Sequence, residues 1–213
     1  MVFKILNRFF PSNTYILKND DCNNCIIVDP GLDSERIHKC IVENNLAPIA
    51  ILCTHGHFDH IASVGYFKKE YSNIPYYLHK DDFKIAKSAN FYLKLTKIKY
   101  WIEHVEPDFI FENEIEEFKI DEFNFTVYHF PGHSNGSCIF KFKNTLFTGD
   151  IIYKTGLGFN KFPGENIKVL KETIKKIILS FDKEYLVYPG HGDNGYLGDF
   201  YSENTELVNF INN

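Results

Sequence analysis

The sequence has no long hydrophobic run, no excess of basic residues and few cysteines. No uncharged stretch approaches the roughly 18 residues that a membrane helix needs, and Lys4 and Arg8 interrupt the apolar N-terminal positions. We therefore expect no membrane segment, signal peptide or anchor. The net charge of −5 lacks the basic face that nucleic-acid recognition requires.

The five cysteines are an odd number at irregular spacing, which is typical of a reduced protein of the cytoplasm. Cys22 and Cys25 form a CxxC pair without a second pair, so we interpret them as part of a turn. The length of 213 residues allows one large core, and no linker, repeat or low-complexity tract divides it. We predict a single domain over residues 1–213.

Apolar and β-branched runs alternate with helical patterns along the chain. We expect strands at 2–6, 13–18, 25–28, 49–53, 75–79, 109–130, 137–142, 145–148 and 185–188. We expect helices at 33–45, 61–71 and 166–180, with Ile37, Ile41, Val42 and Leu46 on the buried face of the first and Ile167, Leu170, Ile174, Ile177 and Ile178 on that of the last. Hairpins beside strand–helix alternation favour two mixed sheets packed face to face, with helices outside.

Residues 81–108 have a helical but unusually aromatic and lysine-rich pattern. Two interpretations fit this segment equally well. It is either an insertion that covers the functional site as a helical cap, or a segment that packs against the core of its own domain.

The densest chemical signal is Thr54-His55-Gly56-His57-Phe58-Asp59-His60, directly after the predicted strand 49–53. His55 and His57 are two residues apart, so in extended backbone their rings point to the same side and can share one metal ion. Asp59 and His60 diverge from that pair and offer ligands to a second ion. Imidazole and carboxylate ligands suit zinc, iron or manganese rather than calcium.

At three later positions a predicted strand also ends at a turn, and a side chain that can bind a metal ion follows directly. His133 follows Pro131-Gly132, Asp150 follows Thr148-Gly149, and His191 follows Pro189-Gly190. Glycine lets the backbone turn sharply where each strand ends. We predict that these side chains converge with the histidine loop on one rim.

This pattern resembles the metallo-β-lactamase superfamily. Its H-x-H-x-D-H motif matches His55, His57, Asp59 and His60, and its later ligands match His133, Asp150 and His191 in the same order. The resemblance spans the chain from the Asp29-Pro30-Gly31 turn to Pro189-Gly190-His191-Gly192. It implies an α/β fold, a four-layer αββα sandwich of two mixed sheets, with the metal site at one edge.

The resemblance also implies how the ligands are shared. His55, His57 and His133 would hold one divalent ion, Asp59, His60 and His191 the other, and Asp150 would bridge them. Zinc is the expected metal, with iron or manganese as alternatives. A water shared by two cations loses a proton far below its bulk pKa of about 15.7, which supplies a bridging hydroxide for hydrolysis. Asp59 is expected to orient that hydroxide.

Within the superfamily the sequence resembles the compact glyoxalase II-like hydrolases, through Gly156-Leu157-Gly158, Phe162-Pro163-Gly164 and Leu197-Gly198. It departs from them at Phe159 and Lys161, where relatives often carry Arg and Asp. It also ends before the helical glutathione-binding domain of the longer enzymes. The resemblance implies a small-molecule thioester substrate such as S-lactoylglutathione. From their position after Asp150, we expect Tyr153, Lys154, Phe159 and Lys161 to reach it.

Other functions remain compatible with these residues. A persulfide dioxygenase would use one iron, and a lactonase would use the same ligands. Gly132-His133-Ser134-Asn135-Gly136 matches the G-x-S-x-G nucleophile motif, but a predicted strand follows it where that motif needs a helix. We assign none of the remaining histidines, His38, His79, His104 and His129, to the metal site, and the sequence does not indicate an oligomeric state.

Overall fold

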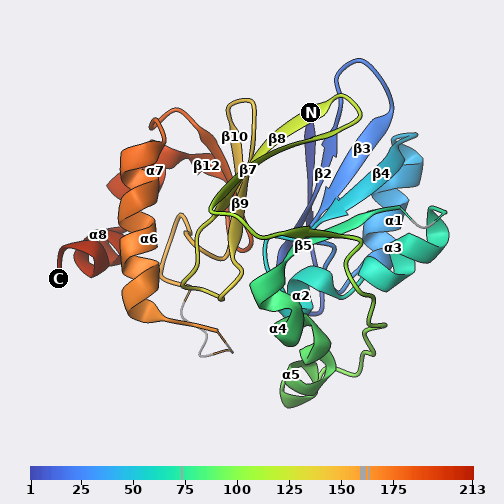
Figure 1. The fold of residues 1–213 in the computed structure, drawn as a ribbon, viewed down its shortest axis with the longest axis horizontal. Helices are drawn as coiled ribbons and strands as arrows, with labels where there is room; N and C mark the ends of the chain where they lie inside the picture. The colour runs from blue at the N-terminus through green and yellow to red at the C-terminus, as the bar shows by residue number, and fades with distance from the viewer. Residues whose placement is uncertain (73, 159–161, 163) are drawn as a thin grey trace.

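Two six-stranded sheets pack face to face with helices on both outer sides, which confirms the predicted αββα sandwich (Figure 1). This computed structural model describes residues 1–72, 74–158, 162 and 164–213. None of the helices in the described part of the chain is both long and apolar enough to cross a membrane.

Each sheet is built from one continuous part of the chain. The first contains, in spatial order, β1 (Val2–Leu6), β2 (Asn13–Lys18), β3 (Asn24–Val28), β4 (Ala47–Leu52), β5 (Tyr76–His79) and β6 (Phe109–Phe111). The second contains β12 (Gly195–Tyr196), β11 (Leu186–Pro189), β10 (Thr145–Gly149), β9 (Cys138–Phe142), β8 (Phe123–His129) and β7 (Ile115–Ile120). Both sheets are mixed, with parallel pairs from β3 to β6 and between β10 and β11.

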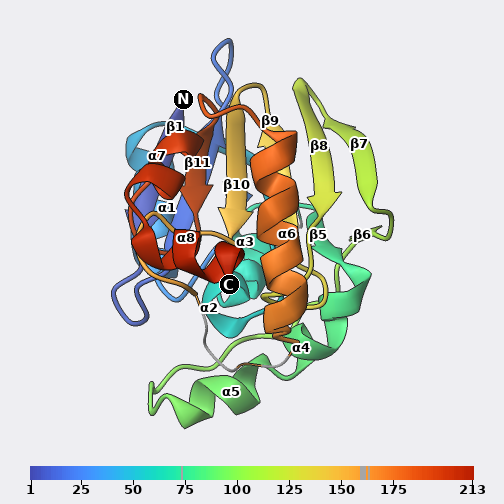
Figure 2. The same cartoon turned by 90° about the vertical axis from the view of Figure 1, so that its left-hand side faces the viewer.

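The helices flank both sheets or lie at one edge of them. Figure 1 shows α1 (Ser34–Glu43) and α3 (Val64–Glu70) beside the first sheet, whereas α2 (Phe58–Ile61), α4 (Phe83–Lys87) and α5 (Ala89–Leu95) lie below its lower edge. Beside the second lie α6 (Ile167–Ser180), α7 (Leu197–Ser202) and α8 (Thr205–Asn212), as Figure 2 shows. A short 3-10 turn, η1 (Lys80–Asp82), leads from β5 into α4.

The core between the sheets is rich in aromatic side chains, because β-strands place alternate residues on the facing surfaces. Phe147 on β10 is fully buried there, with its ring 5.7 Å from that of Tyr15 and 5.4 Å from that of Tyr188. Tyr15 belongs to the first sheet and Phe147 to the second, so this aromatic group joins the two layers.

Phe147→Ala is expected to lower the free energy of unfolding by about 3–5 kcal/mol, because it removes a fully buried ring and leaves a cavity. Chemical denaturation monitored by circular dichroism measures the change. Leu179→Ala is the control, since that side chain is 86% exposed and its loss should stay within about 0.5 kcal/mol. A similar effect of both changes would contradict the assigned core.

Several local predictions were wrong in detail. Val42 is 61% exposed and Ile167 is 48% exposed, so neither lies on the buried face of its helix. The single helix predicted at residues 61–71 is two helices, because α2 ends at Ile61 and α3 begins at Val64. Helices α7 and α8 and strand β12 were not predicted.

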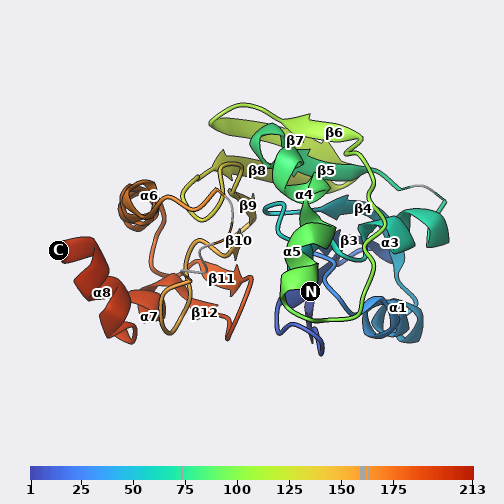
Figure 3. The ribbon, with the colours of Figure 1, turned by 90° about the horizontal axis from the view of Figure 1, so that it is seen from below.

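The aromatic segment 81–108 contains two short helices, after which residues 96–108 run without a helix or strand. Ala86, Ala89, Leu93 and Ile102 pack into the apolar cluster that also contains Phe58 and Phe67. Figure 3, viewed from below, shows α4 and α5 in front of the first sheet. The segment therefore contacts the core of its own domain, and a capping role remains a proposal.

Candidate metal centre

Three histidines that are far apart in the sequence meet at one edge of the sandwich. His55 and His57 follow β4 of the first sheet, and His133 follows β8 of the second. All three are buried, and their ring centroids lie 4.7–4.8 Å apart. Nδ1 of His57 is 2.9 Å from Nε2 of His133. We call this group the three-histidine subsite.

A second group lies beside it and is called the mixed subsite. Asp59 and His60 lie on α2, and His191 follows β11 of the second sheet. Oδ2 of Asp59 is 3.3 Å from Nε2 of His60 and 3.2 Å from Nε2 of His191. In each subsite one donor atom from each residue lies within 4.8 Å of the others, as a shared metal ion requires.

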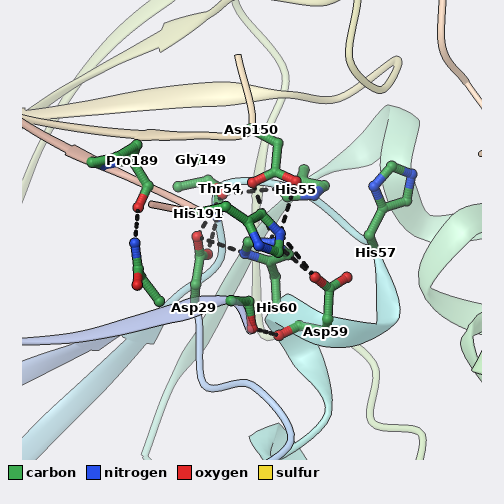
Figure 4. Close-up of polar contacts among 12 residues, drawn as sticks. Asp29, Thr54, His55, His57, Asp59, His60, Gly149, Asp150, Pro189 and His191 are labelled. Atoms are coloured by element: carbon green, nitrogen blue, oxygen red, sulfur yellow. Dashed lines mark hydrogen bonds and ion pairs between the residues drawn. The ribbon is translucent and has the colours of Figure 1, made fainter. Parts of the chain in front are cut away.

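Asp150, at the end of β10, lies between the two subsites. Its Oδ2 is 3.5 Å from Nε2 of His133 and 3.3 Å from Nε2 of His191, and its Oδ1 is 3.4 Å from Nε2 of His60. Figure 4 shows the His191 ring between the carboxylates of Asp59 and Asp150. A Cβ atom at Gly190 would lie 2.0 Å from Oδ1 of Asp150, so only glycine allows this approach.

Hydrogen bonds on the far side of three rings orient them. Nδ1 of His191 donates to the Pro11 carbonyl at 2.7 Å, and Nδ1 of His60 donates to Asp29 at 3.2 Å. Nδ1 of His55 donates to Oγ1 of Thr54 at 3.0 Å. Each bond keeps the proton on Nδ1, so Nε2 is the nitrogen directed into the site and the one that would bind a metal ion once it carries no proton.

Asp29 is a site residue that sequence reasoning missed, because it was interpreted as part of a turn. Its carboxylate is buried and accepts hydrogen bonds from the backbone N–H and the hydroxyl of Thr54, both at 2.7 Å, as well as from His60. The signal that could have revealed it is its position directly after β3, like that of the candidate ligands after β4, β8, β10 and β11.

The site mixes neutral and charged groups in the metal-free protein. Burial lowers the pKa of His55 well below its usual range and that of His133 to about 3, so both are neutral. Burial would also lower the pKa of His191, but Asp150 and Asp59 outweigh it and raise that pKa to about 10. His60 is likewise raised well above its usual pKa, chiefly by Asp150 and then Asp59.

The donors themselves show that divalent cations fit this site. Nε2 of His55 and Nε2 of His60 are buried and have no hydrogen-bond partner among the described residues. The carboxylates of Asp59 and Asp150 are buried beside them, and in the metal-free protein protonated histidines balance their charge, which is costly to bury alone. Cations between these groups would satisfy both. Nitrogen with some oxygen is the donor set of zinc, iron and manganese.

A cavity of about 480 Å³ opens onto the carboxylate side of the centre. Its described lining residues are Phe10, Pro11, Asp59, Asp150, Tyr153, Gly158, Phe162 and His191. Of the residues predicted to reach a substrate, Tyr153 lies in this wall and hydrogen-bonds Asp150. Lys154 instead pairs with Glu203 at 3.3 Å, and Phe159 and Lys161 lie outside the described residues.

A separate group, His79, Asp81 and His129, also brings potential ligand atoms together. The two imidazole rings are stacked, with centroids 3.9 Å apart and planes only 14° from parallel. In-plane lone pairs of parallel rings do not converge on one point, so we assign no ion to this group. His129 donates from Nε2 to the carbonyl of Asn135, in the loop that follows His133.

An αββα sandwich with two adjoining His/Asp subsites at one sheet edge defines a class of metal-dependent hydrolases. The family model described as "Metallo-beta-lactamase superfamily" matches residues 7–191. The chain therefore belongs to the metallo-β-lactamase superfamily. Enzymes of this family act on small molecules and use divalent metal ions.

Similar proteins carry different names. The chain is 33% identical to "Probable metallo-hydrolase YqgX" of Bacillus subtilis over 85% of each chain. It is 30% identical to "Hydroxyacylglutathione hydrolase GloC" of Haemophilus influenzae over 84% of this chain and 85% of that one. The crystal structure of BLEG-1 B3 metallo-beta-lactamase matches with a TM-score of 0.84 and 32% identity, covering 98% of this chain and all of that one.

Proposed function

We propose that this protein hydrolyses a small thioester, such as S-lactoylglutathione, at a centre of two divalent metal ions. The observation that carries the proposal is the position of Asp150, whose carboxylate contacts ligands of both subsites. The complete mixed subsite favours two ions over the single iron of a persulfide dioxygenase. The similarity to GloC supports the thioester as the substrate.

The residues of the two subsites would have different roles in this reaction. His55, His57 and His133 would hold one ion, Asp59, His60 and His191 the other, and Asp150 would lie between them, with zinc in both subsites. When bound, the ions would lower the pKa of a shared water towards neutrality and polarise the thioester carbonyl. Asp59 faces the cavity and would orient that water by accepting its hydrogen bond.

The cavity wall would position the acyl group. Phe10 and Phe162 give it apolar surface, which excludes bulk water and strengthens electrostatic interactions inside. Burial raises the pKa of Tyr153 well above its usual range, so its hydroxyl remains protonated, donates to Asp150 and would hold that carboxylate in place beside the substrate. A thiolate leaves without much protonation, so the absence of a dedicated general acid among the described lining residues is compatible with this reaction.

The protein loaded with zinc, iron or manganese is expected to hydrolyse S-lactoylglutathione, and His57→Ala is expected to abolish turnover. Thiol release measures the rate. Turnover that persists in His57→Ala would contradict catalysis at this centre. If no loaded form turns over the thioester, a lactone, a β-lactam and a persulfide under oxygen are the next substrates to assay, and the thioester proposal falls.

A further inference from the structure

Both subsites straddle the two sheets. The first sheet supplies His55 and His57 to one subsite and Asp59 and His60 to the other, whereas the second sheet supplies His133 and His191. Each subsite therefore keeps its geometry only if a loop from one sheet is held against a loop from the other.

Asp82, at the end of η1, joins the two loops of the three-histidine subsite. Its Oδ2 accepts hydrogen bonds from the Gly56 N–H and the Ser134 hydroxyl, and its Oδ1 accepts one from the Gly136 N–H, all at 2.7 Å. Gly56 lies between His55 and His57, and Ser134 follows His133. The Asp82 side chain is fully buried, so these bonds are made away from water.

The contact between these three segments is as close as backbone packing allows. A Cβ atom at Gly56 would lie 2.8 Å from the Asp82 carbonyl oxygen, and one at Gly136 would lie 2.9 Å from the Asp82 Cγ. The loops therefore meet on this carboxylate with no room for adjustment.

Asn13, at the start of β2, has the equivalent position at the mixed subsite. Its Nδ2 donates to the carbonyls of Pro189 and Gly192, both at 2.9 Å, and its backbone N–H donates to that of Gly190 at 2.6 Å. These carbonyls flank His191 on both sides. The neighbouring Ser12 donates its hydroxyl to the Asp59 carbonyl at 2.8 Å, so the same turn contacts the other half of this subsite.

We propose that Asp82 and Asn13 are positioning residues that each serve a different metal ion. Asp82 joins the two loops of the three-histidine subsite, and Asn13 holds the His191 loop of the mixed subsite on the first sheet. The inference rests on the two-ion centre proposed above. Neither residue is a metal ligand in that proposal, so each acts through the loops that it joins.

Zinc titration against a chromophoric chelator tests this division. His57→Ala and His191→Ala first identify which of the two binding constants belongs to which subsite. Asp82→Asn replaces one carboxylate oxygen by an amide nitrogen, which cannot accept from the loop donors, and it should weaken the three-histidine constant 10- to 100-fold. Asn13→Ala should weaken zinc binding at the mixed subsite by a similar factor. In each variant the binding constant of the unaffected subsite should stay within about threefold of wild type, well below the 10- to 100-fold range.

Asp108→Asn is the matched control, because that carboxylate accepts from the Tyr76 N–H and pairs with Lys68 without contacting the ligand loops. It should lower the unfolding temperature of the metal-free protein without changing either constant. If Asp82→Asn behaves in the same way, or weakens both constants equally, the proposal is wrong.

Ser134→Ala removes a single donor to Asp82 and provides a milder variant should Asp82→Asn fail to fold. It should weaken only the three-histidine constant, and unchanged zinc binding in this variant would overturn the role of Asp82. If wild-type protein binds fewer than two zinc ions, the two-ion centre itself fails, which is a distinct outcome.

Discussion

Asp150→Asn is expected to lower kcat for the thioester by at least about a hundredfold. Loss of a residue that only supports a metal ligand costs up to about a hundredfold, and Asp150 is proposed to be a ligand itself. The amide has no charge and presents N–H hydrogens to at least one of the neighbouring imidazoles. Since the carboxylate contacts ligands of both subsites, its loss should reduce the zinc content as well as the rate.

The fold should survive this change, because asparagine keeps the size and shape of the side chain and His60 and His191 can release the protons that Asp150 stabilises in the metal-free protein. Steady-state kinetics, elemental analysis and thermal unfolding together measure the effect. Asp193→Asn is the control, since that carboxylate is 91% exposed and lies outside the centre. An Asp150→Asn variant with full activity and two bound ions would exclude the bridging role.

Removing the metal ions is expected to abolish activity and to lower the unfolding temperature. An ion at a thousandfold excess over its dissociation constant stabilises the folded state by about 4 kcal/mol, which corresponds to roughly 8–16 °C in a chain of this size. Zinc should restore both properties after chelation. Calcium, which prefers oxygen ligands, should restore neither and serves as the control.

Reloading should also release protons. His191, with its pKa raised to about 10, is protonated at pH 7 in the metal-free protein and must lose that proton to bind a cation through Nε2. Zinc affinity should therefore fall as the pH is lowered. A titration in weak buffer measures the released protons, and zinc binding without any release would contradict the assignment of His191 as a ligand.

The sequence predicted the strands before the ligand loops well, because buried strands need apolar, β-branched runs whatever surrounds them. It also predicted the convergence of His55, His133 and His191, since each follows such a run. The roles of these residues as ligands remain a proposal.

Other features depend on contacts between distant segments. Asp29 looks like a turn residue in the sequence and Asp82 belongs to a segment with a helical pattern, and only contacts with loops distant in the sequence show what their carboxylates accept. Similarly, Val42 and Ile167 fit the apolar periodicity of their helices, but the rotation of each helix against its sheet leaves both exposed. The short α7 and α8 have too few turns for periodicity to predict them.

The division of the chain into one sheet before residue 112 and one after it has a kinetic consequence. Each sheet can form largely by pairing strands that are near one another in the sequence, whereas the ligands come together only once the layers have docked. Metal contacts would thus be absent from much of the folding transition state. Bound ions should then slow unfolding rather than accelerate folding. The long lifetime of the folded, metal-loaded protein would come from a high activation barrier to separating the two sheets.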